Sequence, residues 1–410
     1  MPQLIHQHTF ANGLTLLAER MDHVRSAAVT ILIPIGAAYD PPGREGIGSM
    51  LAEMLTRGAG SRDSRSLALA LDNLGLDRSE SVGGIHLRLS GSTLAQNLPA
   101  VLEIYADLVL RPHLPPGELD AVRSLALQDL AGLEDDPRQK VLLELRKRHY
   151  PAPLSNDRRG TIEGVNAVSA EDIQSHRRRH FHPGGTIISV AGAIDWEKLK
   201  GQVGTLFGDW SNPPQPEPAA GPSRAVVEHI PKDTTQTQIG IAYPSVPFQS
   251  PDYYAAMGAV SVLSGGMSSR LFTEVREKEG LCYAVWATYQ AFKDRGSVIV
   301  YAGTTTPRAQ ETLDVTLRVL RQLSDGIEDD EIERVRAGLK SALIMQEEST
   351  AARAGSLASD WYYLGRVRSF DEIQAAIDAL SPRSVVEHVR RVPPRDFAIV
   401  TLGEKALTIG

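Results

Sequence analysis

The pattern of apolar and polar positions runs through the chain twice. One pair of segments alternates like strands that end at a glycine, one pair opens helices with acidic residues, and one pair forms short apolar strands closed by glycine. These pairs are 84–93 with 296–305, 118–125 with 331–338, and 187–192 with 398–403. In each pair, the second segment follows the first by about 212 residues. The pattern predicts two similar domains. The alternative is that a similar succession of strands and helices recurs by chance within one α/β chain.

A proline-rich segment separates the two halves. Five prolines fall within the ten residues 213–222, and such a run fits neither a helix nor an interior strand. We therefore predict an N-terminal domain over 1–210, a stiff linker over 211–223 and a C-terminal domain over 224–410. Each half reads as two strands, a helix, two strands, two or more helices and a final strand. That order predicts α+β halves, each a mostly antiparallel sheet packed with helices.

Composition narrows the class of protein. A chain of 410 residues exceeds what one hydrophobic core usually serves, and its net charge of −7 offers no basic surface for nucleic acid. No apolar stretch is long enough for membrane insertion. The single cysteine, Cys282, lies in an apolar run and is expected to be a buried, unreactive thiol. The first ten residues lack a signal-peptide pattern, so we expect a cytoplasmic protein, or a periplasmic one if the sequence is a processed form.

The segment 46–58 predicts an amphipathic helix. Its apolar positions recur at helical spacing, and they are Ile47, Met50, Leu51, Met54 and Leu55. Another face carries Ser49, Ala52 and Glu53. Helical geometry places positions 49 and 53 side by side, one turn apart.

An ordered set of short motifs resembles the pitrilysin/insulinase family of zinc peptidases. The motifs cover essentially the whole chain, at residues 10–16, 36–40, 46–58, 135–137, 181–183, 268–272 and 280–283. In that family the helix at 46–58 carries an inverted H-x-x-E-H zinc motif, whose histidines bind zinc and whose glutamate activates water. The matching positions here are Ser49, Ala52 and Glu53, and the family's third ligand falls at or next to Asp129.

These four positions lack the donors that zinc prefers. Catalytic zinc usually takes three ligands that include nitrogen or sulfur, whereas Glu53 and Asp129 offer only carboxylate oxygens. We therefore expect no metal or other cofactor on this chain and a solvated or salt-bridged Glu53. A second candidate metal set is His176, His180 and His182, but the three arginines at 177–179 oppose a bound cation.

The second half keeps an arginine and a tyrosine near each other. Residues 270–280 read as a helix with Gly280 at its C-terminal end, so Arg276 lies in its last turn. The next strand alternates, with Tyr283, Val285, Ala287 and Tyr289 on one side. On residue pattern alone, Arg276 would compensate the helix dipole and Tyr283 would be half-buried. The resemblance implies a different role, in which both reach the substrate at the other half's zinc site and bind it in the transition state.

The resemblance therefore implies a non-catalytic partner subunit. We expect two α+β halves forming a clam-like subunit, inactive alone, that pairs with a homologous H-x-x-E-H subunit carrying the zinc. The heterodimer would hydrolyse peptides, and a homodimer remains open. The alternative is a structural or assembly subunit, like the peptidase-derived core subunits of respiratory complexes, in which Arg276 and Tyr283 are relics.

Overall fold

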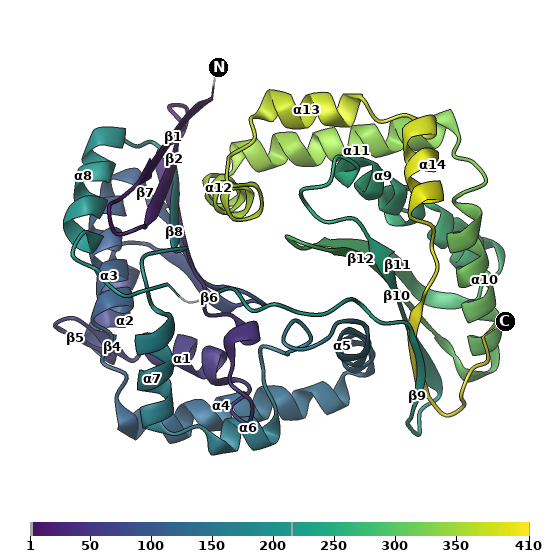
Figure 1. Ribbon diagram of the computed structural model, residues 1–410, viewed down its shortest axis with the longest axis horizontal. Helices are drawn as coiled ribbons and strands as arrows, with labels where there is room; N and C mark the ends of the chain where they lie inside the picture. The colour runs from purple at the N-terminus through teal and green to yellow at the C-terminus, as the bar shows by residue number, and fades with distance from the viewer. Residues whose placement is uncertain (1–2, 215, 410) are drawn as a thin grey trace. The chain divides into compact units, whose positions relative to one another are not determined.

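The computed structural model describes residues 3–214 and 216–409 (Figure 1). The chain divides into two compact units, and neither is one continuous stretch. The first unit comprises Met1–Gly132, Ala152–Ala220 and Met345–Val367. The second comprises Leu133–Pro151, Gly221–Ile344 and Arg368–Gly410. Each unit is α+β, as the sequence predicts.

The first unit is built on a six-stranded sheet of order β1-β2-β8-β3-β7-β6, in which only β2 and β8 run parallel. Its strands are β1 (Leu4–Thr9), β2 (Thr15–Arg20), β3 (Ser26–Ile33), β6 (Asp77–Val82), β7 (Leu87–Leu94) and β8 (Ile187–Gly192), and β4 (Gly58–Ala59) and β5 (Arg62–Asp63) form a small separate pair. Its helices are α1 (Ile47–Leu55), α2 (Ser64–Asn73), α3 (Leu98–Leu110), α4 (Leu119–Gly132), α6 (Ile162–Ala167), α7 (Ala170–His180), α8 (Trp196–Phe207) and α12 (Thr350–Leu364).

The second unit repeats this plan with a five-stranded sheet of order β11-β12-β10-β13-β9, in which only β13 and β9 run parallel. Its strands are β9 (Val226–Pro231), β10 (Gln236–Ser245), β11 (Cys282–Ala291), β12 (Gly296–Thr305) and β13 (Ala398–Gly403). Its helices are α5 (Pro137–His149), α9 (Tyr253–Ser264), the π-helical turn η5 (Phe272–Lys278), α10 (Ala309–Gln322), α11 (Asp329–Glu348, whose last turn belongs to the first unit), α13 (Phe370–Asp378) and α14 (Pro382–Arg391).

The three segment pairs recognised in the sequence occupy equivalent places in the two sheets. Strand β7 corresponds to β12, helix α4 to α11, and strand β8 to β13. The last pair begins and ends where the apolar runs predict, at 187–192 and 398–403. The repeat and the mostly antiparallel sheets are thus confirmed.

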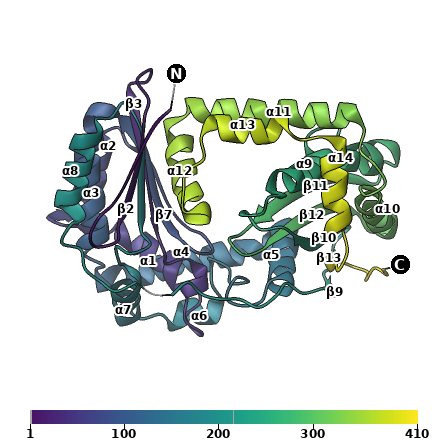
Figure 2. The ribbon, with the colours of Figure 1, turned by 45° about the horizontal axis from the view of Figure 1, so that its top comes forward.

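Helix α12 comes from the second half of the sequence but covers one face of the first sheet. Figure 2 shows it there, with α2, α3 and α8 on the opposite face. Its Leu357 and Ala358 pack against Leu17, Leu32 and Ile187 of the sheet. Because β2, β3 and β8 are therefore buried on both faces, they read as continuous apolar runs rather than alternating ones.

A buried ion pair fastens α12 to the sheet. The Arg353 side chain on α12 is 1% exposed and donates through Nε, at 2.8 Å, and through Nη2 to the Glu19 carboxylate on β2. Glu347 lies 3.2 Å from Arg353 Nη1. Charges this deeply buried persist only when they are paired and hydrogen-bonded.

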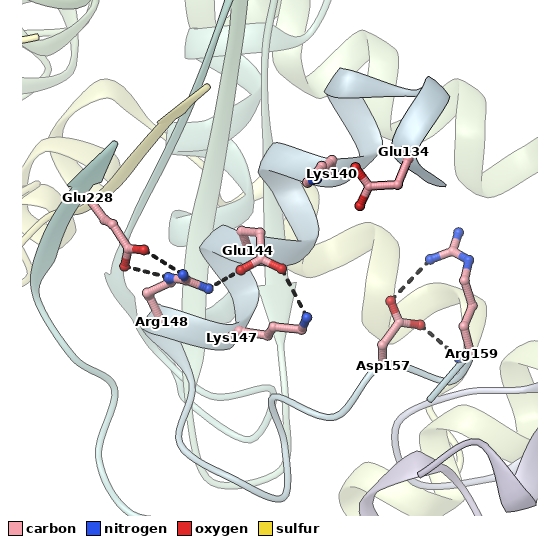
Figure 3. A network of polar contacts seen from close by, with 8 residues as sticks. All are labelled: Glu134, Lys140, Glu144, Lys147, Arg148, Asp157, Arg159 and Glu228. Atoms are coloured by element: carbon pink, nitrogen blue, oxygen red, sulfur yellow. Dashed lines mark hydrogen bonds and ion pairs between the residues drawn. The ribbon is translucent and has the colours of Figure 1, made fainter. Parts of the chain in front are cut away.

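Helix α5 makes the reverse exchange. It comes from the first half of the sequence, yet its Val141 and Leu145 pack against Ala242, Tyr301 and Val400 of the second sheet. Its last turn is held by ion pairs, since Arg148 binds both oxygens of Glu228 on β9 at 2.6 Å and also contacts Glu144 (Figure 3). Each sheet thus has one face covered by a helix from the other half of the sequence.

The predicted division at the linker therefore does not describe the packing of α5 and α12. Helix α5 precedes the linker in sequence but packs in the second unit, and α12 follows the linker but packs in the first. The described residues of the segment 211–223 form neither helix nor strand, between α8 and β9. No helix within residues 3–214 and 216–409 combines the length and apolar character needed to cross a membrane.

Candidate functional site

The helix that matches the family's zinc motif is well formed. Asp40 caps its N-terminus, accepting hydrogen bonds from the amides of Gly46 at 2.7 Å and Gly48 at 3.1 Å. Burial raises the pKa of Asp40 to about 7, although these two hydrogen bonds oppose the shift. All five predicted stripe residues of α1 are buried in the core of the first unit. The positions in question, 49, 52 and 53, lie on the remaining faces.

None of these three positions offers a free zinc ligand. The Ser49 hydroxyl donates to the Arg158 carbonyl at 2.6 Å, and Ala52 is buried. The Glu53 carboxylate accepts from Arg57, one turn along α1, at 2.6 Å. Arg57 also lies 3.7 Å from Glu118. Glu53 is thus the salt-bridged residue of a surface pair.

The fourth position, Asp129, lies on α4, which packs against α1. Its carboxylate is 3.3 Å from Arg159 Nε. The guanidinium of Arg159 is mostly buried and also binds Asp157 at 3.1 Å (Figure 3). A positive charge therefore stands beside each carboxylate of the degenerate motif, through Arg57 and Arg159.

The donor set of these positions does not fit a catalytic zinc ion. It contains no nitrogen or thiolate ligand, and its two carboxylates are neutralised by arginines. Within the described part of the chain, no group of three or more His, Cys, Asp and Glu side chains is placed to hold a metal ion.

The histidines at 176 and 180 are core residues of α7 rather than exposed ligands. Their rings lie 4.7 Å apart, and burial lowers the pKa of His176 to about 3 and that of His180 to about 4. His182 Nδ1 donates to the Gly184 carbonyl at 2.6 Å. These histidines are therefore neutral near pH 7, packed or hydrogen-bonded within the first unit.

Arg276 lies in η5, where the helix widens to a π-helical turn before it ends. Its side chain is exposed, and the guanidinium carbon lies 4.8 Å from the Phe272 ring centroid. Gly280 follows with φ of +59°, the left-handed conformation predicted for the residue that closes this helix. The next strand, β11, contacts η5, so Arg276 and Tyr283 belong to adjoining elements.

Tyr283 sits in a β-bulge, and this changes the face on which its side chain lies. Cys282 pairs with Thr304 and Ala284 pairs with Gly303, so Tyr283 is the extra residue between them. Val285, Ala287 and Tyr289 pack against the core on the opposite face, where alternation had placed Tyr283 as well. That prediction was wrong, because strand alternation assumes an uninterrupted ladder.

The bulge aims the Tyr283 phenol at two glutamines of β10. Its hydroxyl donates to Gln236 Oε1 at 2.7 Å and accepts from Gln238 Nε2 at 3.3 Å. The Tyr283 side chain remains 46% exposed, so its hydroxyl is held in place yet open to solvent. Such a phenol can donate a hydrogen bond to an incoming carbonyl oxygen.

Four residues of these sites were not singled out in the sequence. Arg57 was accessible to sequence reasoning, since a basic residue four positions after Glu53 on a helix is its natural partner. Arg159, Gln236 and Gln238 carry no local signal, because they meet their partners only through tertiary packing.

Comparison with known proteins identifies the family. The helix and strand framework carries the positions of a zinc-peptidase site without its zinc ligands. Residues 15–161 match the profile of the insulinase family, peptidase family M16, and residues 167–339 match that of the peptidase M16 inactive domain. The chain belongs to the M16, or pitrilysin/insulinase, family of peptidase-type proteins.

Relatives match along nearly the whole chain. An uncharacterized zinc protease of Streptomyces coelicolor is 28% identical, over 97% of this chain and 89% of its own. One from Bacillus subtilis is 25% identical, over 97% and 98%. A peptidase M16 inactive domain from Pseudomonas fluorescens superposes with a TM-score of 0.91 at 19% identity, over 99% of both chains. A protease from Helicobacter pylori gives 0.89 at 18% identity, over 98% of this chain and 99% of its own.

Proposed function

We propose that this chain is the non-catalytic subunit of a heterodimeric zinc metallopeptidase. The observation that carries the proposal is an asymmetry between its two units. In the first, the zinc-motif positions hold arginine-paired carboxylates. In the second, a bulge holds the Tyr283 hydroxyl half-exposed, on the strand that follows the exposed Arg276.

The retained pair suits the stabilisation of an oxyanion. In peptide hydrolysis, negative charge develops on the former carbonyl oxygen, and fixed hydrogen-bond donors aimed at that oxygen lower the barrier. A phenol supplies one donor and a guanidinium supplies several together with a positive charge. Removing one such donor typically lowers kcat by about 10²–10³-fold.

The missing half of the chemistry is assigned to a partner. A homologous subunit with an intact H-x-x-E-H helix would bind the zinc, while this chain contributes Arg276, Tyr283 and part of the peptide-binding surface. A second copy of this chain lacks the ligands to fill that role. The expected compartment is the cytoplasm, or the periplasm if the sequence is a processed form.

The test compares zinc content and peptidase activity in three samples. These are the purified chain alone, a co-expressed H-x-x-E-H homologue alone, and their mixture, assayed on internally quenched peptides. We expect substoichiometric zinc and no activity in the chain alone, and activity in the mixture. Stoichiometric zinc with chelator-sensitive activity in the lone chain would overturn the proposal.

Variants test the assigned residues within the active mixture. Tyr283→Phe and Arg276→Ala should each lower kcat by about 10²-fold while the zinc content of the mixture stays constant. Tyr289→Phe is the matched control, because Tyr289 lies on the same strand and its hydroxyl donates to the Val246 carbonyl instead. Arg318→Ala is the exposed-arginine control in the same unit. Full activity of both test variants would favour the structural or assembly role instead.

A further inference from the structure

Beneath Tyr283 lies a buried polar pair with no role in the scheme above. Gln238 on β10 and Tyr301 on β12 are 3% and 2% exposed. The Tyr301 hydroxyl donates to Gln238 Oε1 at 2.5 Å, and Gln238 Nε2 donates to the Tyr283 hydroxyl oxygen at 3.3 Å. A buried amide is costly unless its polar atoms are satisfied, and both of these hydrogen bonds serve that need.

These contacts fix which atom donates and which accepts in the series of hydrogen bonds that runs from Tyr301 through Gln238 and Tyr283 to Gln236. With its oxygen taken by Tyr301, the Gln238 amide presents its NH₂ group to Tyr283. The Tyr283 oxygen therefore accepts, and its only hydrogen points elsewhere. It goes to Gln236 Oε1 at 2.7 Å, on an exposed residue. Hydrogen bonds linked in series in this way polarise one another and strengthen the terminal donor.

A glycine makes this arrangement possible. Gly303 lies opposite both Gln238 and Ala284 in the ladder. A β-carbon there would come within 2.6 Å of the hydroxyls of both Tyr283 and Tyr301. The two phenols can therefore approach the same amide only because position 303 has no side chain.

We propose that Gln238 is a positioning residue that fixes Tyr283 as a hydrogen-bond donor, and that Gln236 occupies the place of a substrate carbonyl oxygen. The inference rests on the proposed function, because it assigns Gln238 a task through Tyr283. Gln236 is the exchangeable acceptor, being exposed at the start of β10, whereas Gln238 and Tyr301 form the fixed support.

The first experiment uses the isolated chain and needs no activity. NMR spectra of the chain with ¹³C-labelled tyrosine rings would be recorded for the wild type, Gln238→Leu and Thr237→Val, with Tyr283→Phe assigning the signal. Thr237 is the matched control, because it is the buried neighbour on β10 and its hydroxyl has no hydrogen-bond partner in the described residues. We expect the Tyr283 signal to shift in Gln238→Leu and to stay in Thr237→Val. An unchanged signal in Gln238→Leu overturns the inference.

The second experiment uses the active mixture with an H-x-x-E-H homologue and an internally quenched peptide. Gln238→Leu should lower kcat roughly 10-fold to 100-fold with little change in KM, because a displaced donor acts mainly in the transition state. Gln238→Glu should regain activity relative to wild type as pH falls from 8 to 6, since only a protonated carboxyl can both accept from Tyr301 and donate to Tyr283. A merely structural role would not produce that pH profile.

The outcomes separate the two claims. If Tyr283→Phe lowers kcat but Gln238→Leu and Gln238→Glu behave as wild type, the positioning role is refuted while the proposed function survives. If Tyr283→Phe and Arg276→Ala both leave kcat unchanged, the proposed function has failed, and the NMR comparison alone decides whether Gln238 orients Tyr283.

Discussion

Replacing Arg353 with methionine should destabilise the first unit severely. Arg353 is 1% exposed and Glu19 is 5% exposed, and the guanidinium binds Glu19 through two nitrogens and Glu347 through a third. Methionine keeps most of the buried side-chain volume but leaves the carboxylates of Glu19 and Glu347 without their guanidinium partner, although both still accept hydrogen bonds from the Gln3 amide. The loss is therefore electrostatic rather than a matter of packing.

The magnitude follows from the cost of an unpaired buried charge. Removing one partner of a buried ion pair typically costs about 3–5 kcal/mol. For a unit of this size, that corresponds to a fall in Tm of about 6–20 °C. The double variant Glu19→Leu/Arg353→Met should recover more than half of the loss, because it removes the more deeply buried of the two stranded carboxylates and replaces the Glu19–Arg353 pair with apolar groups.

The loss should also depend on pH. Burial already raises the pKa of Glu347 against the opposing charge of Arg353, so without Arg353 this carboxyl would hold its proton still more tightly when folded than when unfolded. A carboxyl whose folded pKa is raised contributes less stability as pH increases through that pKa. The destabilisation of Arg353→Met should therefore be smaller at pH 5 than at pH 8.

Urea unfolding followed by circular dichroism at both pH values measures these effects. Arg20→Met is the control on the same strand, since Arg20 pairs with Asp22 at the surface and its loss should cost under about 0.5 kcal/mol. A loss below about 1 kcal/mol for Arg353→Met, or a double variant no more stable than the single one, would refute the assignment of this pair as the fastening of α12.

Three further predictions concern the cap of α1, the single cysteine and the degenerate motif. Asp40→Asn should flatten the fall of Tm between pH 5 and 8, because the wild-type carboxyl, with a pKa of about 7, binds a proton in the folded state over a range where the unfolded chain has lost it. A profile as steep as that of the wild type would contradict this. Cys282 is half-buried rather than fully buried as the sequence predicts, yet desolvation raises its pKa to about 11, so it should react with iodoacetamide at pH 8 far more slowly than after unfolding in urea. Equal rates would refute this raised pKa. Glu53→Gln should change the free energy of unfolding by less than about 0.5 kcal/mol, and EDTA should leave the Tm of both proteins unchanged. A fall in Tm on chelation would reveal a structural metal.

Part of the candidate site was accessible to pattern reasoning and part was not. The helix carrying Ser49, Ala52 and Glu53 follows from an apolar stripe at helical spacing, and the absence of zinc ligands follows from residue identity. The closing glycine of η5 was also predictable, because its positive φ suits glycine. The bulge at Tyr283 was not, since nothing in the alternation of β11 marks an inserted residue.

The sequence by itself determined the duplication, the order of strands and helices in each half, and the loss of the zinc ligands. These properties depend on local periodicity and on residue chemistry, both of which can be read along the chain. Only the tertiary structure decided that α5 and α12 each pack on the sheet of the other half of the sequence. It also decided that Arg159 pairs with Asp129 and that Gln238 donates a hydrogen bond to the Tyr283 hydroxyl. An apolar helix face shows that it must be buried but not against which sheet, and an ion pair between distant segments has no periodic signal.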